Sequence, residues 1–185
     1  TAARLRRNDE NAEIIMFERG EHVSFSNCCL PYHLSNTVEN SDSLVLMNPT
    51  KFKKSHNIDA RVNSEVIAIN RKDKTVRVKN VIANEEYDES YDKLVLAPGA
   101  NPIMPKSIAG IDKEHVFSVR NVTDIRKIKA YIDQDSIENV VVVGGGFIGL
   151  EIAENLMKKG LSVTVLDMAA QIMPNIFDVE MADYI

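Results

Sequence analysis

The feature that most constrains the fold is a glycine-rich turn between a run of valines and an apolar helical pattern. Four valines at 140–143 precede Gly144-Gly145-Gly146-Phe147-Ile148-Gly149, which has the spacing G-x-G-x-x-G. A second apolar run, 161–166, follows Gly160 and ends at Asp167, 18 residues after Gly149. Strand, helix and strand in this order form a βαβ unit, whose two strands are parallel. The sequence therefore predicts the α/β class.

The spacing of the glycines is typical of a turn that binds a dinucleotide. Gly144 permits the tight turn, Gly146 lets a pyrophosphate approach the backbone, and Gly149 lets the helix lie close to the strand. The helix N-terminus then offers N–H groups and a positive dipole end to the phosphates. A turn without a ligand is the alternative, but four of the chain's eight glycines fall here, which packing alone does not explain.

Asp167 predicts which dinucleotide is preferred. A carboxylate at this strand end accepts hydrogen bonds from the ribose hydroxyls and repels a 2′-phosphate. The following residues, Met168-Ala169-Ala170-Gln171, contain no arginine that could hold such a phosphate. NADH is therefore favoured over NADPH.

A second acidic strand end and the only two cysteines lie in the first part of the chain. The predicted strand 12–17 is followed by Glu18, which is either a second ribose-binding acid or an exposed strand-end acid. Cys28 and Cys29 come ten residues later. A thiol becomes reactive beside a helix N-terminus or a cation, and Leu30-Pro31-Tyr32 is predicted to begin a helix. The alternative is a small buried side chain, which suits Cys29.

The remaining segments give a coarse map of the chain. Residues 1–7 resemble the interior of a helix, residues 91–100 a buried strand, and residues 101–111, with two prolines and a glycine, a linker at a domain boundary. We also expect a hairpin at 62–78 with its turn at 71–74, a further antiparallel strand within 81–91, a short helix from Asn48-Pro49-Thr50 to His56, a helix from Asp124 to Ile132 capped by Thr123, and a last helical segment from Asp178.

Bulk properties exclude several classes of protein. The 185 residues are 44% hydrophobic, as in a globular protein with a core, and the net charge of −5 indicates no basic surface for nucleic acid or anionic membrane. The apolar runs are too short to span a bilayer, and no signal peptide opens the sequence. Two adjacent cysteines provide no disulfide framework, and a bond between them would be strained. We therefore expect a cytoplasmic protein.

The segment Ser24-Phe25-Ser26-Asn27-Cys28-Cys29-Leu30-Pro31-Tyr32 resembles the active-site motif of the coenzyme A-disulfide reductase branch of the pyridine nucleotide-disulfide oxidoreductases. That branch also includes NADH oxidases, NADH peroxidases and persulfide reductases. The likeness continues through residues 91–100 (a second FAD motif), 118–121, the NAD motif and 163–174, so it spans essentially the whole chain. It implies Rossmann-like FAD- and NAD(P)-binding domains with parallel sheets, helices and a small antiparallel β layer.

The resemblance also implies a chain that is truncated relative to the family. The first FAD glycine loop, the C-terminal FAD segment and the dimerisation domain have no counterpart here. We expect a partial FAD-binding domain at 1–110 and the N-terminal part of an NAD-binding domain at 111–185. The fragment alone is expected to be inactive, and the full-length protein to be a homodimer.

Roles for individual residues follow from the same resemblance. Cys28 corresponds to the single redox-active cysteine beside the flavin. Ser24 and Asn27 would flank the substrate thiol. Arg4 and Arg7 fall where the family contacts coenzyme A phosphates, a task that suits guanidinium, although a solvated helix face explains them equally well. His56 is a further substrate contact. The cofactor-binding set is Glu18, Arg19, Val66, Ala97, Gly99, Arg120, Gly144, Gly146, Phe147, Ile148, Gly149, Glu151 and Asp167, and no metal ligand is predicted.

The resemblance leaves three functions open. The first is an FAD- and NADH-dependent enzyme that reduces coenzyme A disulfide or a persulfide, with Cys28 as the redox thiol. The second is an NADH oxidase or peroxidase in which Cys28 cycles through a sulfenic acid. The third is a non-catalytic nucleotide-binding redox module. One departure from the family is Cys29, which stands where the motif usually has glycine or alanine.

Overall fold

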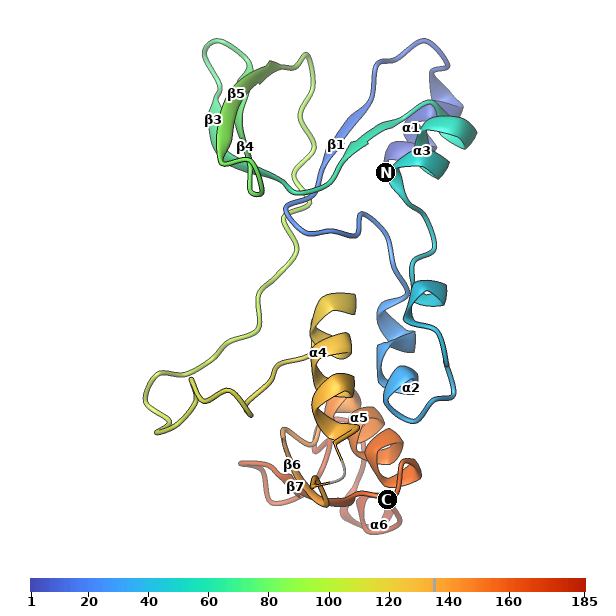
Figure 1. The fold of residues 1–185 in the computed structure, drawn as a ribbon, viewed down its shortest axis with the longest axis vertical. Coiled ribbons are helices and arrows are strands. Elements are labelled where there is room, and N and C mark those ends of the chain that lie inside the picture. Colours follow the sequence, from blue (N-terminus) through green and yellow to red (C-terminus); the bar gives the residue numbers. More distant parts are fainter. Residues whose placement is uncertain (135) are drawn as a thin grey trace. The chain divides into compact units, whose positions relative to one another are not determined.

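The computed structural model describes residues 1–134 and 136–185, which form two compact units (Figure 1). The first unit comprises residues 1–25 and 45–100, and the second comprises residues 26–44 and 101–185. The first contains α1 (Ala2–Asn8), β1 (Ile15–Phe17), α3 (Pro49–His56), β2 (Asp59–Arg61), β3 (Ser64–Asn70), β4 (Thr75–Asn80) and β5 (Glu85–Ser90). The second contains the 3₁₀ helices η1 (Asn27–Cys29) and η2 (Ser41–Leu44), then α2 (Leu30–Leu34), α4 (Val122–Ile132), β6 (Asn139–Val143), α5 (Phe147–Lys158), β7 (Ser162–Leu166) and α6 (Val179–Ala182).

In the first unit, β1 and β2 form a two-stranded parallel sheet, in which Ile15 lies opposite Asp59 and Phe17 opposite Arg61. The predicted strand at 12–17 is thus confirmed only for its last three residues. The helix predicted after Asn48 is also confirmed. The Asn48 side chain accepts a hydrogen bond from the Lys51 amide, and α3 ends where Asn57 takes a left-handed conformation.

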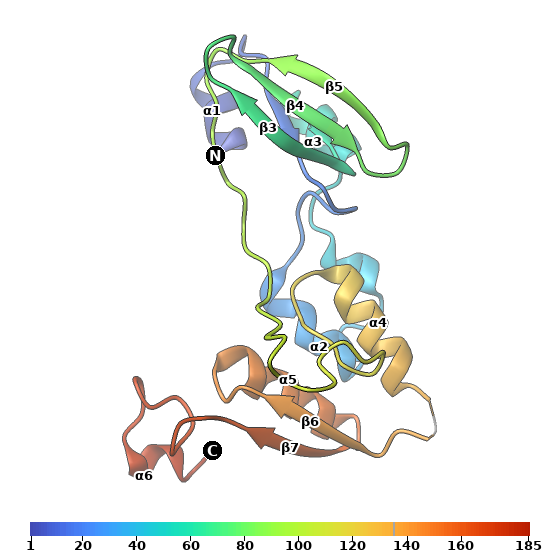
Figure 2. The same cartoon turned by 90° about the vertical axis from the view of Figure 1, so that its left-hand side faces the viewer.

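The second sheet of the first unit is the antiparallel β layer that the sequence predicts. β3, β4 and β5 are adjacent in that order, as Figure 2 shows. The turn at 71–74 joins β3 to β4, and a bulge between Val66 and Ala68 shifts their register. Val76 and Val78 on the central strand are buried. The predicted hairpin and its third strand are confirmed.

Arg61 holds the two sheets of the first unit together. Its guanidinium donates hydrogen bonds to Asp59 (2.8 Å), to Glu89 on β5 (2.5 Å) and to the Tyr87 hydroxyl (3.2 Å). It also lies 5.5 Å from the centre of the Phe17 ring. Partial burial opposes the charge, but the hydrogen bonds from Arg61 to Glu89, Tyr87 and Asp59 outweigh it and raise the pKa of Arg61 above its ordinary value.

The second unit contains the predicted βαβ unit. β6 and β7 are parallel, with Val140 opposite Val163 and Val143 opposite Leu166, and α5 connects them. α2 packs against both α4 and α5, and these three helices enclose the core of the unit. The buried apolar side chains on the three helices are Leu30, Leu34, Val122, Ile125, Ile128, Ile132, Ile152, Ala153 and Leu156.

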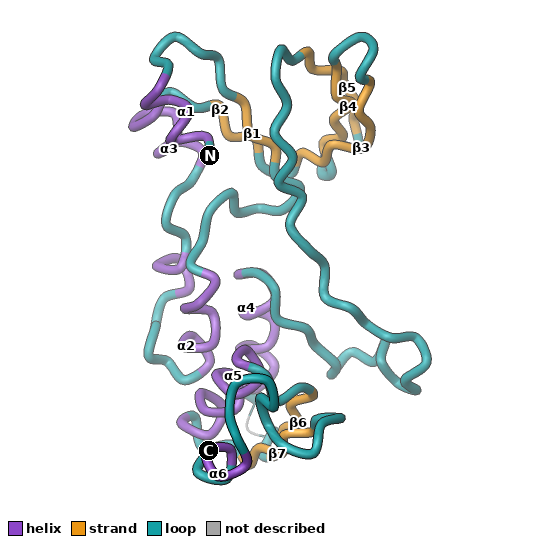
Figure 3. The backbone as a smooth tube through the Cα atoms, turned by 180° about the vertical axis from the view of Figure 1, so that it is seen from behind, coloured by secondary structure: helices purple, strands orange, loops and turns teal. Residues whose placement is uncertain are grey.

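Two local predictions are wrong. The N-cap of α4 is Asn121 rather than Thr123, because the Asn121 side chain accepts from the Asp124 amide (2.9 Å) while the Asp124 carboxylate accepts from the Asn121 amide (3.2 Å). Residues 91–100 form no strand and appear as loop in Figure 3. Val95 and Leu96 are 62% and 68% exposed. An apolar run becomes a strand only where a neighbouring strand pairs with it.

Two further predictions concern membrane spans and the domain boundary. Within the described residues, no helix is long and apolar enough to cross a membrane. The predicted domain boundary at 101–111 remains a prediction.

We expect Arg61→Leu to lower the free energy of unfolding by about 2 kcal/mol, because Glu89 and Asp59 lose a shared, partly buried partner. Urea denaturation monitored by circular dichroism measures this. The matched control is Arg77→Leu, which breaks an exposed bidentate pair between β4 and Asp88 of β5, within one sheet, and should cost much less. Equal losses in the two variants would show that Arg61 is not the joint between the sheets.

Candidate active site

The glycine loop between β6 and α5 forms an open turn at the N-terminus of the helix. Gly144 has a φ of 112°, a conformation that favours glycine, and its amide donates to the Leu166 carbonyl (2.7 Å). Gly146 is the N-cap of α5. A Cβ built at Gly144 or Gly146 would meet no atom within 4 Å, so the space beside the loop is free to accept a ligand. This is the surface that a pyrophosphate requires.

Gly149 allows α5 to approach the strand it follows. A Cβ at this position would lie 1.8 Å from the Gly144 carbonyl oxygen and 3.5 Å from Val142 Cγ1. The first of these contacts is with backbone, so no side-chain movement relieves it. The role that the motif predicts for its third glycine, close packing of helix on strand, is therefore present in the structure.

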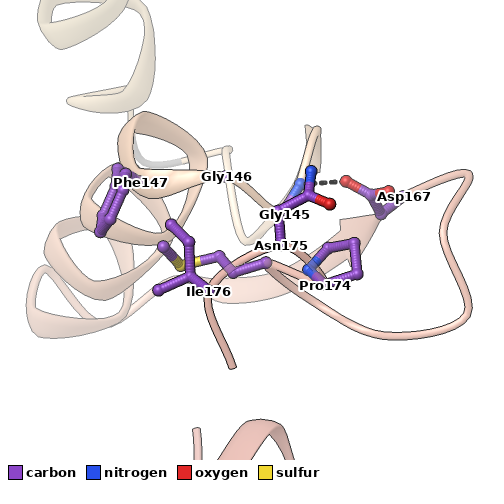
Figure 4. A pocket seen from close by; sticks show the side chains of 8 residues that line it. Gly145, Gly146, Phe147, Asp167, Pro174, Asn175 and Ile176 are labelled. Carbon is purple, nitrogen blue, oxygen red and sulfur yellow. Dashed lines mark hydrogen bonds between the residues drawn. The ribbon is translucent and has the colours of Figure 1, made fainter. Parts of the chain in front are cut away.

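Asp167 is tied directly to the loop. Its carboxylate accepts hydrogen bonds from the Gly145 amide (2.6 Å), drawn in Figure 4, and from the Ala169 amide (2.8 Å). The Ala169 and Gly145 amides hold the pKa of Asp167 below its ordinary value of 3.8, so the carboxylate is ionised at neutral pH. A carboxylate has about four acceptor positions, which leaves capacity for ribose hydroxyls.

A hollow of about 220 Å³ lies between the loop and the segment after β7 (Figure 4). Besides Gly145, Gly146, Phe147 and Asp167, its lining consists of Met173, Pro174, Asn175 and Ile176. The sequence motifs singled out none of these last four as site residues. Met173 has a positive φ of 46°, and the Gln171 side chain donates to the Phe177 carbonyl (2.9 Å), so the segment forms a closed turn beside the loop.

The other residues predicted on α5 lie near its start. Phe147 and Ile148 are 62% and 63% exposed, so both apolar side chains are accessible to a planar ring. Glu151 is half-buried, and its carbonyl accepts from the Asn155 side chain (2.8 Å).

Cys28 is an exposed thiol in η1, immediately before α2, and Cys29 is half-buried. The predicted helix start is confirmed, with Leu30 and Pro31 buried in its first turn. The structure also brings two predicted residues together beside the thiol. The Arg120 guanidinium donates to the side chain of Asn27 (3.4 Å), the residue immediately before Cys28.

In the first unit, the three arginines of α1 have different surroundings. Arg6 donates to four backbone carbonyls, those of His56, Asp9, Glu10 and Asn57. Arg6 thus ties α1 to the end of α3. Arg4 and Arg7 are exposed, which leaves the two predicted arginines, and not the middle one, accessible to an anion.

The remaining predicted residues also lie in the first unit. Glu18 directly follows β1, at the carboxyl end of a parallel strand, and its side chain accepts from the Gly20 amide (2.7 Å). His56 ends α3 beside Phe52, Ser24 pairs with Met47 in an isolated bridge, and Arg19 is exposed. Val66 stands at the bulge in β3, and Ala97 and Gly99 lie in the exposed segment 91–100.

A sequence model described as pyridine nucleotide-disulphide oxidoreductase matches residues 1–185. The chain belongs to the pyridine nucleotide-disulphide oxidoreductase family. Curated relatives include a coenzyme A disulfide reductase of Staphylococcus haemolyticus, 40% identical over 171 residues, 92% of this chain and 38% of the relative. An NADH oxidase of Methanocaldococcus jannaschii is 35% identical over 185 residues, all of this chain and 41% of the relative. The chain thus spans about two fifths of these proteins.

Several solved structures have the same fold as this chain. Reduced CoADR-RHD from Bacillus anthracis is 50% identical, with a TM-score of 0.93 over 99% of this chain and 33% of its own. An NAD-dependent persulfide reductase from A. fulgidus is 37% identical, with a TM-score of 0.92 over 99% of this chain and 34% of its own. An engineered water-forming NADPH oxidase bound to NADPH is 30% identical, with a TM-score of 0.90 over 99% of this chain and 40% of its own.

Two sets of residues have a geometry that fits a dinucleotide. The open turn at Gly144 and Gly146, the exposed start of α5 and the ionised Asp167 together suit an NADH molecule. For FAD, Glu18 has the position at a strand end that a ribose-binding acid requires. Among the described residues, no cluster of three or more His, Cys, Asp or Glu could hold a metal ion.

The hydrogen bonds to Asp167 predict how acid affects the loop. Because the folded pKa is depressed, the stabilisation by Asp167 is complete above its ordinary pKa of 3.8 and is lost as the pH falls through the lower folded value. The difference in melting temperature between the wild type and Asp167→Asn should therefore stay constant from pH 7 to pH 5 and shrink below about pH 4. Differential scanning calorimetry across this range measures it. A difference that shrinks already between pH 7 and pH 5 would contradict the assignment.

Proposed function

We propose that this protein is a flavin-dependent oxidoreductase that takes an electron pair from NADH and delivers it, through FAD, to a sulfur bonded to Cys28. The observation that carries the proposal is the exposed Cys28 thiol at the start of α2, beside the Asn27–Arg120 hydrogen bond and in the same compact unit as the glycine loop. A thiol in this setting is accessible to a small disulfide, and the loop suits the electron donor.

The net reaction converts NADH, a proton and coenzyme A disulfide into NAD⁺ and two coenzyme A thiols. The Cys28 thiolate attacks one sulfur of the substrate, which breaks its S–S bond, forms a mixed disulfide and releases the first thiolate. An incoming electron pair then breaks the mixed disulfide, which releases the second thiolate and regenerates Cys28. Bound FAD would supply the two-electron relay between nicotinamide and sulfur.

The residues of this chain would hold the cofactors as follows. The free space beside Gly144 and Gly146 would admit the NADH pyrophosphate to the N-terminal amides of α5, and Asp167 would bind the adenosine ribose. Phe147, Ile148 and Glu151 would lie beside the nicotinamide. Residues that would contact FAD are Glu18, Arg19, Val66, Ala97, Gly99 and Arg120.

A coenzyme A disulfide or a related persulfide is the proposed substrate. Relatives described as coenzyme A disulfide reductase and NAD-dependent persulfide reductase support this class. The exposed Arg4 and Arg7 would bind the phosphates of coenzyme A, with His56 as a further contact, and Ser24 and Asn27 would flank the reacting thiol. A homodimeric, cytoplasmic enzyme belongs to the same proposal.

An NADH oxidase or peroxidase is the second candidate, favoured by the 35% identity to the M. jannaschii protein. In that reaction a peroxide oxidises the Cys28 thiolate to a sulfenic acid and leaves as water or an alcohol. Two electrons and two protons then return the sulfenic acid to thiol and water. The exposure of Cys28 suits both candidates.

NADH is the proposed coenzyme, and the engineered NADPH oxidase supports this. It differs from its Lactobacillus brevis parent at a glycine, an aspartate 18 positions later, the alanine and methionine that follow, and a proline seven positions after the aspartate. This chain has Gly149, Asp167 and Pro174 at the same intervals, with Met168 and Ala169 after the aspartate. Arginines replace the alanine and the proline in the engineered protein. This chain has neither arginine.

The function is tested with the protein expressed from its complete gene. Purified protein should show a flavin absorption spectrum, and coenzyme A disulfide should accelerate NADH oxidation. Cys28→Ser should lower disulfide-dependent turnover by roughly 10³-fold or more, because the electron pair reaches the substrate through that sulfur. Flavin reduction by NADH should persist in this variant. Stopped-flow spectroscopy separates the two steps.

Cys29→Ser is the matched control and should keep most of the activity. Absence of bound flavin would sink the enzyme assignment and favour the nucleotide-binding redox module. NADH oxidation that needs oxygen or peroxide and does not respond to the disulfide would favour the second candidate.

Coenzyme preference should be reversible at Asp167 and Pro174, which line the hollow, together with Met168, which follows Asp167 in the sequence. The triple variant Asp167→Ala, Met168→Arg, Pro174→Arg removes one negative charge and adds two positive ones where a 2′-phosphate would lie. We expect the ratio of kcat/KM for NADPH to that for NADH to rise by at least about tenfold, roughly the value of one charge-assisted hydrogen bond. The exposed Met157→Arg is the control, and an unchanged ratio in the triple variant would exclude this face from coenzyme selection.

A further inference from the structure

Asn155 is a fully buried polar side chain in an apolar setting. It lies on α5 among Ile152, Ala153 and Leu156, all of which are buried, and its own exposed fraction is 0%. A buried amide is costly unless its hydrogen bonds are satisfied. The hydrogen bonds that Asn155 makes inside the protein are therefore required for this packing.

Those partners connect α5 to the segment that carries the cysteines. The Ser35 hydroxyl donates to Asn155 Oδ1 at 2.6 Å, and Asn155 Nδ2 donates to the Glu151 carbonyl at 2.8 Å. The hydroxyls of Ser35 and Thr37 lie 2.9 Å apart. A chain of hydrogen bonds thus runs from the residues just after α2 to the backbone of Glu151, one turn into the helix of the glycine loop.

Because of where Ser35 lies, this chain of bonds can fix the position of α2. Ser35 is the C-cap of α2, a helix of five residues that begins immediately after Cys29. So short a helix has little stability of its own and takes its position from tertiary contacts. Leu30 and Leu34 provide apolar contacts, which are non-directional. The Ser35–Asn155 hydrogen bond is directional and can form at only one position of α2 along α5.

We infer that Asn155 is a positioning residue, which through Ser35 locks α2, and with it the Cys28–Cys29 pair, in register with the helix of the glycine loop. The consequence is selectivity between the two thiols: Cys28 is held in solvent and Cys29 is held half-buried. The inference deepens the proposed function, on which only its kinetic consequence rests, because thiol selectivity requires no cofactor.

The test compares Ser35→Ala, which removes the hydroxyl, with Ser35→Thr, which keeps it, in the protein expressed from its complete gene. The exposed Ser43→Ala, in the same segment, is the matched control. Rates of iodoacetamide alkylation at Cys28 and Cys29 are measured by peptide mass spectrometry without added NADH. We expect Ser35→Ala to raise the rate at Cys29 relative to Cys28 by about tenfold, and Ser35→Thr and Ser43→Ala to stay within twofold of the wild type.

Steady-state kinetics give the second readout. Ser35→Ala should lower kcat for disulfide reduction about tenfold while KM for NADH changes less than twofold, because the glycine loop is untouched. Asn155→Leu, which removes the bonds to Ser35 and Glu151 and keeps a branched side chain of four heavy atoms, should have the same effects. An unchanged alkylation ratio in Ser35→Ala would overturn the inference, even if the protein proves to be the proposed enzyme. An altered ratio that Ser35→Thr does not restore would overturn it too.

Discussion

The close approach between the start of α5 and the end of β6 is the constraint on which the second unit depends. With Gly149 at this place, the helix comes within a distance of Gly144 that a single methyl group would prevent. That approach directs the N-terminal amides of α5 toward the open side of the loop and puts the Gly145 amide within hydrogen-bonding reach of Asp167. The arrangement of the loop, the acidic strand end and the hollow beside them thus depends on the absence of a side chain at Gly149.

The thiol segment depends on the same helix from another side. α2 packs against α5 and α4, and the buried Asn155 adds a directional bond to contacts that are otherwise apolar. Arg120, just before α4, reaches Asn27 next to Cys28. The residue just before the α4 N-cap and the helix α5 therefore each supply a polar contact to the segment that contains the cysteines. These contacts support the proposed redox role of Cys28.

Sequence patterns were most reliable where the signal is local. The hairpin with its turn at 71–74, the helix that opens at Asn48-Pro49-Thr50 and the βαβ unit all follow from short-range chemistry, and all are present. The N-cap of α4 was misplaced because Asn121 and Thr123 are both good capping residues, and only the reciprocal bond with Asp124 decides between them. The apolar run at 94–96 was misread as a strand because apolarity predicts burial, whereas a strand also requires a partner.

Residue types at fixed short spacings are enough to predict the glycine turn, the acid that follows it and the thiol motif. The sequence did not predict that Asn27 contacts Arg120. It also did not predict that Arg6, rather than Arg4 or Arg7, donates its hydrogen bonds to backbone carbonyls. Nor did it place Asn155 against Ser35, although a polar residue on the apolar face of a helix was a visible signal. These contacts join residues 50 to 120 positions apart, and only the packing of the helices and strands sets such distances.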